Sequence, residues 1–204
     1  MLNTVGAGVA LLAALTTGAC GDDGPGELAG AVRTPPLEVS GVSLPAVDDG
    51  GEEPLTMQAP PGELYLVYFG YTSCPDVCPT TMSDISVALD DLPDDLAERV
   101  TVAMASVDPE RDTGEVVAGY LDHFFDRSLA LRTDDPDALA TAADAFGVQW
   151  EIEEHAPGVA YDVAHSAVTY VVDDTGTVVV EWPFGFDSEA MASDLRILLE
   201  EEHP

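Results

Sequence analysis

The sequence predicts an α/β sandwich with a central mixed sheet flanked by helices, since strand-like and helix-like patterns alternate along the chain. Two segments, 64–69 and 100–107, are apolar without alternation, which is typical of strands buried on both faces. Near the C-terminus, 166–173 and 177–182 have the pattern of two strands, joined by the turn residues 174–176.

Local signals define several further elements. Short apolar stretches broken by Gly and Pro, around 37–44 and 53–57, predict a small N-terminal hairpin. Apolar residues at spacings of 3, 4 and 3 within 82–92 form one face of a helix that Pro93 ends. Ser188 is expected to open a last helix, whose apolar face carries methionine and leucine.

Capping residues place two more helices around a short strand. Thr113 is expected to cap a helix that runs towards Phe124. The segment 129–132 is predicted to be a short strand. In the next helix Asp135 is the predicted cap, a proline takes the first helical position, and Gly147 lies just past the end.

The charge balance is strongly acidic. The 204 residues include 39 Asp and Glu against 6 bases, all of them arginine, and the formal net charge is -33. Such a surface repels phosphate backbones, which excludes nucleic-acid binding. The length and a hydrophobic content of 46% fit one globular domain plus a leader. We interpret the acids as a solvated surface suited to a salty or extracellular setting, which also raises the local concentration of cations.

Residues 1–20 are interpreted as a signal peptide with a lipoprotein-type cysteine. The run 5–19 is apolar or small, and it suits the hydrophobic region of an export signal better than a bilayer span. Small residues directly before Cys20 resemble a bacterial lipoprotein cleavage site, so Cys20 would carry the lipid. Two features depart from this pattern: no Lys or Arg precedes the run, and Thr17 stands where leucine is usual. Ordinary secretory cleavage near Ala19 and an uncleaved anchor are the alternatives.

Residues 21–35 are rich in Gly, Pro and acids, and we expect them to form a flexible tether. The globular domain would then occupy 36–204. This organisation predicts an exported protein at the extracytoplasmic face of a bacterial cell membrane, held there by the lipid on Cys20.

The motif that carries the chemistry follows the first buried strand and has the sequence GYTSCPDVCP, at 70–79. Each cysteine precedes a proline, which biases both away from helical angles. We therefore place Cys74 in a tight turn and Cys78 at the cap of a helix whose first residue is Pro79. The positive end of the helix dipole favours thiolates there. Two thiolates are soft donors suited to Cu(I), and the same pair could close a disulfide. A disulfide across so short a loop stabilises a fold only weakly, which argues against an inert staple.

This motif resembles that of the Sco/SenC family, whose members are copper chaperones for respiratory oxidase. Further matches are SVDPERDT at 106–113 and HSAVTYVVD at 165–173, and the matches follow in order from about residue 37 to the C-terminus. The resemblance implies a thioredoxin-like fold. It also implies copper, as Cu(I) or Cu(II), bound by Cys74, Cys78 and one histidine.

The chain has four histidines. His165 matches the family's ligand histidine, because it directly precedes an apolar strand; on sequence alone it could equally be a half-buried core residue. His203 lies in the tail, His123 within a helix, and His155 in an acidic stretch expected to be an exposed loop. We expect these three to be surface or packing residues.

Acidic residues near the expected site are not predicted to bind metal. Many relatives carry an acid immediately before the histidine, whereas here Ala164 holds that position and the nearest acid is Asp162. The sequence therefore offers no adjacent carboxylate to orient the imidazole. Asp76 and Asp108 are expected to lie near the site; Asp108 is interpreted as a strand-end cap, and neither as a direct ligand.

The leading functional hypothesis is a metallochaperone that passes copper, by ligand exchange, to the dinuclear copper centre of cytochrome c oxidase. Its partners would be the copper-acceptor subunit and, through the lipid, the membrane; we expect a monomer. The alternative is a thiol–disulfide oxidoreductase in which Cys74 and Cys78 reduce the acceptor's cysteines. The spacing of three intervening residues, and the absence of a necessary role for His165, argue mildly against it. A thiol peroxidase is a weaker alternative, because its threonine-to-cysteine motif is not visible.

Overall fold

The computed structural model describes residues 26–48 and 51–201. The strands are β1 Ser43–Asp48, β2 Gly51–Thr56, β3 Leu64–Gly70, β4 Val100–Ser106, β5 Ser128–Leu131, β6 Trp150–Ile152, β7 Val163–His165, β8 Val168–Val172 and β9 Val178–Pro183. The helices are α1 Val77–Asp90, α2 Asp94–Ala97, α3 Gly114–Leu121, α4 Pro136–Phe146 and α5 Ser188–Glu201.

The main sheet has seven strands in the order β2-β1-β5-β4-β3-β8-β9, and β6 and β7 form a separate two-stranded ribbon. β3 and β4 pair in parallel, as do β4 and β5, whereas β8 runs antiparallel to both β3 and β9. The predicted mixed sheet and N-terminal hairpin are therefore confirmed. Every residue of β3 and of β4 is buried, because these strands occupy the centre of the sheet and are covered on both faces.

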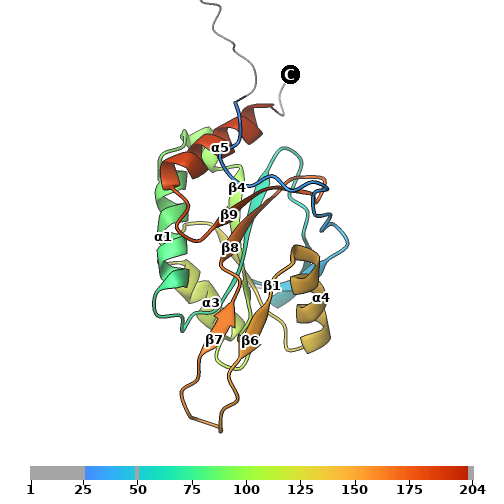
Figure 1. Ribbon diagram of the computed structural model, residues 1–204, viewed down its shortest axis with the longest axis vertical. Helices are drawn as coiled ribbons and strands as arrows, with labels where there is room; N and C mark the ends of the chain where they lie inside the picture. The colour runs from blue at the N-terminus through green and yellow to red at the C-terminus, as the bar shows by residue number, and fades with distance from the viewer. Residues whose placement is uncertain (1–25, 49–50, 202–204) are drawn as a thin grey trace, which may run out of the picture.

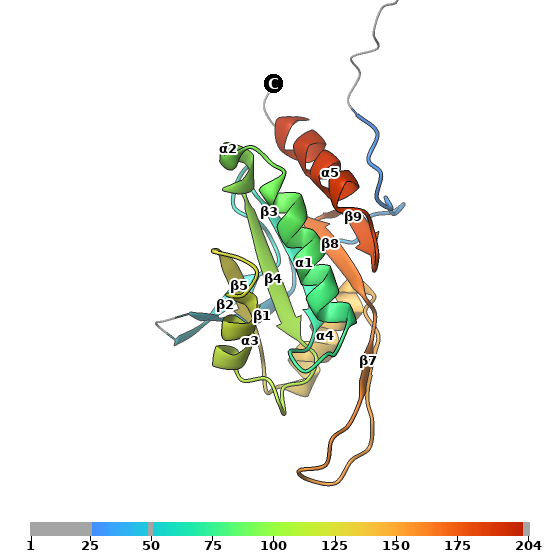
Figure 2. The same ribbon diagram turned by 90° about the vertical axis from the view of Figure 1, so that its left-hand side faces the viewer.

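Helices cover both faces of the sheet (Figure 1). α1 and α5 lie side by side on one face together with α3, and α4 lies on the opposite face (Figures 1 and 2). β3 and β4 end at one edge of the sheet, and α1 begins at this edge (Figure 2). The β6–β7 ribbon and the loop that joins its strands project beyond the same edge. The cysteine motif and His165 therefore meet at one end of the molecule.

The capping predictions for α3 and α4 are confirmed. The side chain of Thr113 accepts a hydrogen bond from the backbone N–H of Val116, and Asp135 accepts hydrogen bonds from the first turn of α4. Gly147 ends α4 with a φ of 70°, in the left-handed region that glycine adopts without strain.

The predicted start of the helix after the cysteines was wrong. α1 begins at Val77, so Cys78 lies in its first turn and Pro79 is its third residue. The steric preference of a residue before proline for extended angles is only a bias, and Cys78 is helical despite it. The N–H groups of the first turn of a helix have no intrahelical acceptor. The missing N–H of Pro79 therefore costs no hydrogen bond.

Two elements were not predicted from the sequence. The short helix α2 follows Pro93, and the β6–β7 ribbon takes up part of the stretch 151–158 that we expected to be a loop. Strands of three residues give too little alternation to be recognised by periodicity. The ribbon matters because His165 is the last residue of β7.

The segment before β1 is attached to the domain by a buried carboxylate. Asp194, on α5, is fully buried and accepts hydrogen bonds from the backbone N–H groups of Ala29 (2.6 Å) and Gly30 (3.0 Å). It also accepts the indole N–H of Trp182 at 2.9 Å. A buried carboxylate requires such donors, and this segment supplies two of the three.

Part of the segment 21–35, predicted to be a flexible tether, therefore lies against the domain. Residues 29–31 are held by Asp194 and by an antiparallel bridge between Ala31 and Glu181. The predicted signal peptide at 1–20 and its Cys20 lie outside the described residues.

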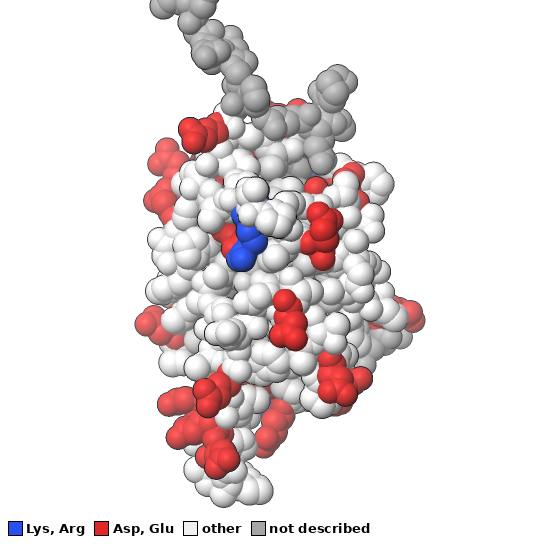
Figure 3. All heavy atoms as spheres, turned by 45° about the vertical axis from the view of Figure 1, so that its right-hand side comes forward, with Lys and Arg blue, Asp and Glu red and all other residues white. Residues whose placement is uncertain are grey.

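Acidic side chains are spread over the surface and gather on the projecting β6–β7 ribbon and its loop (Figure 3). The exposed acids of this region are Glu151, Glu153, Glu154 and Asp162. Among the described residues, no helix is both long enough and apolar enough to cross a membrane.

The contacts of Asp194 lead to a prediction about stability. Asp194→Ala should lower the free energy of unfolding by roughly 3 kcal/mol, since it removes the buried acceptor of three hydrogen bonds and leaves the buried indole N–H of Trp182 without a partner. Glu200→Ala, at an exposed position of the same helix, should change it by less than about 0.5 kcal/mol. Urea unfolding measures the free energy of unfolding of each variant. Equal midpoints for the two variants would contradict the role of Asp194 as a buried acceptor.

Candidate metal centre

Cys74, Cys78 and His165 come together at the end of the sheet, although 87 positions separate Cys78 from His165. Cys74 lies in the turn after β3, Cys78 in the first turn of α1, and His165 at the end of β7. One ligand atom from each residue lies within 4.8 Å of the other two. Among the described residues this is the one cluster of at least three His, Cys, Asp or Glu side chains that could hold a metal ion.

A second buried carboxylate fixes the turn that carries Cys74. Asp112 accepts hydrogen bonds from the backbone N–H (3.1 Å) and the hydroxyl (2.6 Å) of Thr72, and from the hydroxyl of Ser106 at 2.7 Å. Ser106 is the last residue of β4. Asp112 therefore ties the cysteine turn to the end of the neighbouring strand. Sequence reasoning noted Asp112 within the motif at 106–113 but gave it no role.

Gly70 leaves room for the sulfur of Cys78. A Cβ atom at this position would lie 2.6 Å from the ring of Tyr68 and 3.1 Å from the Sγ of Cys78. A larger residue at the end of β3 would therefore displace either the ring or the thiol. The glycine in the motif is required by this close approach.

The two thiols are chemically unequal. Cys74 is half-buried, which acts to raise its pKa, but hydrogen bonds from the backbone N–H groups of Cys78 (3.3 Å) and Asp76 outweigh burial and lower the pKa. Cys78 is fully buried, and burial raises its pKa to about 12. The expectation that the helix start favours both thiolates is therefore wrong for Cys78, whose side chain points into the core while Cys74 receives the helix N–H groups.

The imidazole of His165 is oriented for binding through Nε2. Its Nδ1 lies 3.1 Å from the carbonyl oxygen of Ser166, which can only accept, so Nδ1 carries the proton. Its Nε2 lies 3.4 Å from the Sγ of Cys78. Burial lowers the pKa of His165, so the ring is neutral at pH 7 and Nε2 has a free lone pair. The backbone carbonyl thus orients the ring without the acid that many relatives carry at the position of Ala164.

Two tyrosines enclose this imidazole, and sequence reasoning missed both. Tyr68 and Tyr71 meet the ring edge-on, with centroids 5.9 and 5.7 Å away. The hydroxyl of Tyr68 also donates to the Sγ of Cys78 at 3.7 Å. The signal was available in the sequence, because both residues lie close to Gly70 in the stretch that leads into Cys74.

The buried acidic residue Asp108, near the centre, is occupied by other partners. Asp108 is fully buried, forms an ion pair with Arg111 and accepts the hydroxyl of Tyr161 at 2.7 Å. The guanidinium of Arg111 stacks on the ring of Tyr161, 3.7 Å from its centroid. Asp108 is thus more than a strand-end cap: it joins the loop after β4 to the segment before β7. Asp76 and Asp108 both lie outside the metal-site cluster.

The other histidines lie away from the centre. His155 stacks on Tyr161 with centroids 3.6 Å apart, so its side chain is packed although its backbone lies in the expected loop. His123 is exposed and its Nδ1 donates to the carbonyl of Gly119. His203 lies outside the described residues.

Together, the fold and the site define an α/β domain with two thiols and a neutral imidazole at the start of a helix, a donor set for a soft metal ion. Comparison with known proteins agrees: the SCO1/SenC family model matches residues 46–200. The chain belongs to the SCO1/SenC family.

Individual relatives support the same conclusion. The SCO2-like protein RP587 of Rickettsia prowazekii is 34% identical over 116 residues, which is 56% of each chain, so this chain spans little more than half of that relative's length. The apo Sco1 protein from Thermus thermophilus is 32% identical, with a TM-score of 0.71 over 84% of this chain and 97% of that one. Bradyrhizobium japonicum ScoI, solved with copper bound, is also 32% identical, with a TM-score of 0.64 over 76% of this chain and 96% of that one. The thioredoxin-like fold is confirmed.

The unequal thiols predict selective alkylation. Iodoacetamide should modify Cys74 at least ~100-fold faster than Cys78 near pH 8, because only Cys74 is accessible and has a lowered pKa. Since the pKa of Cys74 is lowered, its rate should fall off at a lower pH than that of the same cysteine in the unfolded chain. Peptide mass spectrometry assigns the label. In Cys74→Ser, Cys78 should stay unlabelled until the chain unfolds; rapid labelling of Cys78 in the folded variant would refute the assignment.

Proposed function

We propose that this chain binds copper through Cys74, Cys78 and His165 and delivers it, outside the cytoplasm, to the dinuclear copper centre of cytochrome c oxidase. The observation that carries the proposal is the convergence of two thiol sulfurs and one lone-pair nitrogen within 4.8 Å. The copper-bound relative from Bradyrhizobium japonicum supports the choice of metal.

The donor set suits copper for a chemical reason. Thiolates are soft ligands that favour Cu(I), and an imidazole nitrogen serves both copper oxidation states. Cys74 is prepared to bind as a thiolate, whereas Cys78 would lose its proton as the metal enters, because coordination by a cation offsets the cost of burying the charge. Copper uptake is then accompanied by proton release and weakens as the pH falls.

Delivery would proceed by exchange of ligands. Thiolates of the acceptor bind the ion while the ligands of this chain leave, so copper is held throughout and no covalent bond of a substrate breaks. The half-exposed position of Cys74 and His165 allows a partner to approach the ion, whereas Cys78 holds it from the buried side.

A thiol–disulfide oxidoreductase is the second candidate function, and the unequal thiols favour it. An accessible thiol with a lowered pKa in front of a buried partner is the arrangement of an attacking and a resolving cysteine. In this reaction the thiolate of Cys74 would attack an acceptor disulfide and release one acceptor sulfur as a thiolate, which takes a proton from water. Cys78 would then attack the sulfur of Cys74 and displace the second acceptor thiolate, to which the Cys78 proton passes. The products are a Cys74–Cys78 disulfide and an acceptor dithiol.

The replacement His165→Ala distinguishes the two functions. A copper carrier loses one of three ligands, so copper affinity should fall more than roughly 10-fold and oxidase activity in cells should decline. Exchange with a small disulfide should stay within about 3-fold of wild type, since it needs only the two sulfurs. Metal analysis and competition with a Cu(I) chelator measure copper binding, and thiol-exchange kinetics measure the rate of disulfide exchange.

The control is Cys74→Ser/Cys78→Ser, which should lose both copper binding and exchange. If His165→Ala binds copper as tightly as wild type and supports full oxidase assembly, the carrier function is refuted in favour of the reductase.

We further propose that export removes residues 1–19 and attaches a lipid to Cys20, which would hold the domain at the membrane. The support is the apolar run that ends in small residues before Cys20. Mass spectrometry of the membrane fraction should find a mature chain that begins with lipid-modified Cys20. A Cys20→Ser variant should leave the membrane fraction; a mature wild-type chain with unmodified Cys20, or one that retains Met1, would contradict lipoprotein processing.

A further inference from the structure

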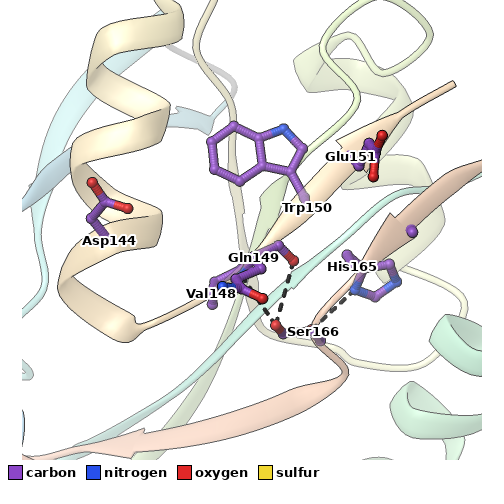
Figure 4. Close-up of a pocket in the computed structure, with 8 residues that line it drawn as sticks. Asp144, Val148, Gln149, Trp150, Glu151, His165 and Ser166 are labelled. Carbon is purple, nitrogen blue, oxygen red and sulfur yellow. Dashed lines mark hydrogen bonds between the residues drawn. The ribbon is translucent and has the colours of Figure 1, made fainter. Parts of the chain in front are cut away.

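An open groove of about 640 Å³ borders the metal centre on the side of His165 (Figure 4). It lies between the C-terminal part of α4, the strand β6 and the end of β7. His165 belongs both to the lining of this groove and to the metal-site cluster. A molecule in the groove would therefore touch one of the proposed copper ligands.

The groove is preformed by the backbone. Ser166 donates its N–H to the carbonyl of Gln149 at 2.9 Å, and its hydroxyl accepts the N–H of Gln149 at 3.0 Å. Trp150, the next residue, pairs directly with His165 in the β6–β7 ladder. These contacts hold the floor of the groove and the ligand histidine in one rigid unit.

The chemistry of the groove fits a cationic segment. Its charged lining residues are Asp144 and Glu151, both exposed, and no arginine or lysine lines it among the residues that the structure describes. The half-buried indole of Trp150 stands between α4 and β6 (Figure 4). An indole face beside carboxylates attracts guanidinium and ammonium groups through cation–π and Coulomb attraction.

We propose that this groove is the docking surface for the copper acceptor, and that it receives an Arg- or Lys-bearing segment next to the acceptor's thiols. The inference rests on the proposed copper transfer.

Cys78 is inaccessible, so an incoming thiolate must reach the ion beside Cys74 or His165, and His165 is the ligand that lines the groove. A new S–Cu bond forms as the Nε2–Cu bond of His165 breaks; the copper keeps its oxidation state, and any thiol proton passes to water. The neutral imidazole is the ligand displaced first because Cu(I) prefers thiolates.

The test measures Cu(I) transfer from the loaded chain to the soluble copper-acceptor domain of the oxidase. A synthetic peptide with two cysteines flanked by arginines serves as a second acceptor. The variant Asp144→Asn/Glu151→Gln removes the charges of the groove without changing side-chain size. It should slow transfer at low ionic strength at least ~5-fold while leaving copper affinity unchanged. Asp144 lies on α4 and not on the ribbon that carries His165. The single variant Asp144→Asn should therefore show part of the same loss of transfer rate.

The matched control removes the same charge elsewhere. Asp90 and Glu189 line another acidic groove, at the far end of α1, about 20 Å from the turn that carries Cys78. Asp90→Asn/Glu189→Gln should leave the transfer rate within about 2-fold of wild type. Equal slowing by both variants would mean that only net charge matters, and would overturn the docking surface. Unchanged transfer in the groove variant would overturn it as well.

Docking can also be observed without copper. The chain has two tryptophans, and Trp182 is buried against Asp194, so its indole N–H is an internal reference. In NMR spectra of the apo chain, an arginine-flanked peptide with serines in place of cysteines should shift the Trp150 indole signal and not that of Trp182. A glutamate-flanked peptide should shift neither. No shift at Trp150 would refute docking. Failure of wild-type protein to transfer copper, with the Trp150 shift present, would refute the proposed function and not the docking surface.

Discussion

The metal centre depends on the buried carboxylate of Asp112. The turn that carries Cys74 has no regular secondary structure of its own, and Asp112 holds it through the backbone and side chain of Thr72. The same carboxylate binds Ser106 at the end of β4. A buried charge without partners would be costly, so the three hydrogen bonds are a condition of burial and not merely an addition to it. The position of the cysteine turn relative to the sheet is thereby fixed.

With the turn fixed, the inequality of the thiols follows from geometry. The N–H groups at the start of α1 point at the sulfur of Cys74, while the sulfur of Cys78 lies inside, under Gly70 and beside Tyr68. One sulfur is stabilised as a thiolate by donors and the other is held as a thiol by burial. This asymmetry serves either proposed function, because metal binding and disulfide exchange both need one accessible sulfur and one retained partner. The imidazole bears on the two functions differently, since copper binding uses its nitrogen, 3.4 Å from the buried sulfur, as a third ligand, whereas exchange needs no third ligand.

The sequence predicted the parts of this structure that depend on local pattern. The buried strands, the caps of α3 and α4 and the position of the cysteines after β3 all follow from periodicity or from the chemistry of one residue. What it did not predict depends on contacts between distant segments. The ribbon β6–β7 is stabilised by its own pairing and by the stack of Arg111 on Tyr161, and the N-terminal segment is held by Asp194. The different pKa values of Cys74 and Cys78 likewise arise from tertiary burial, which two cysteines in similar sequence contexts do not reveal.

The acidity of the chain makes the absence of carboxylates from the metal-site cluster informative. With 39 acids in the sequence, a site for hard cations could form easily wherever carboxylates gather. Yet the two buried carboxylates that flank the centre are saturated: Asp112 by Thr72 and Ser106, and Asp108 by Arg111 and Tyr161. Neither can turn towards an ion without abandoning these partners in the interior. Because their oxygens are engaged, the donors that converge are sulfur and nitrogen, which favours soft ions over Ca²⁺ or Mg²⁺. The two buried acids beside the centre thus contribute to selectivity because each of their oxygens already has a partner, while the exposed acids of the groove remain free to attract a cationic partner.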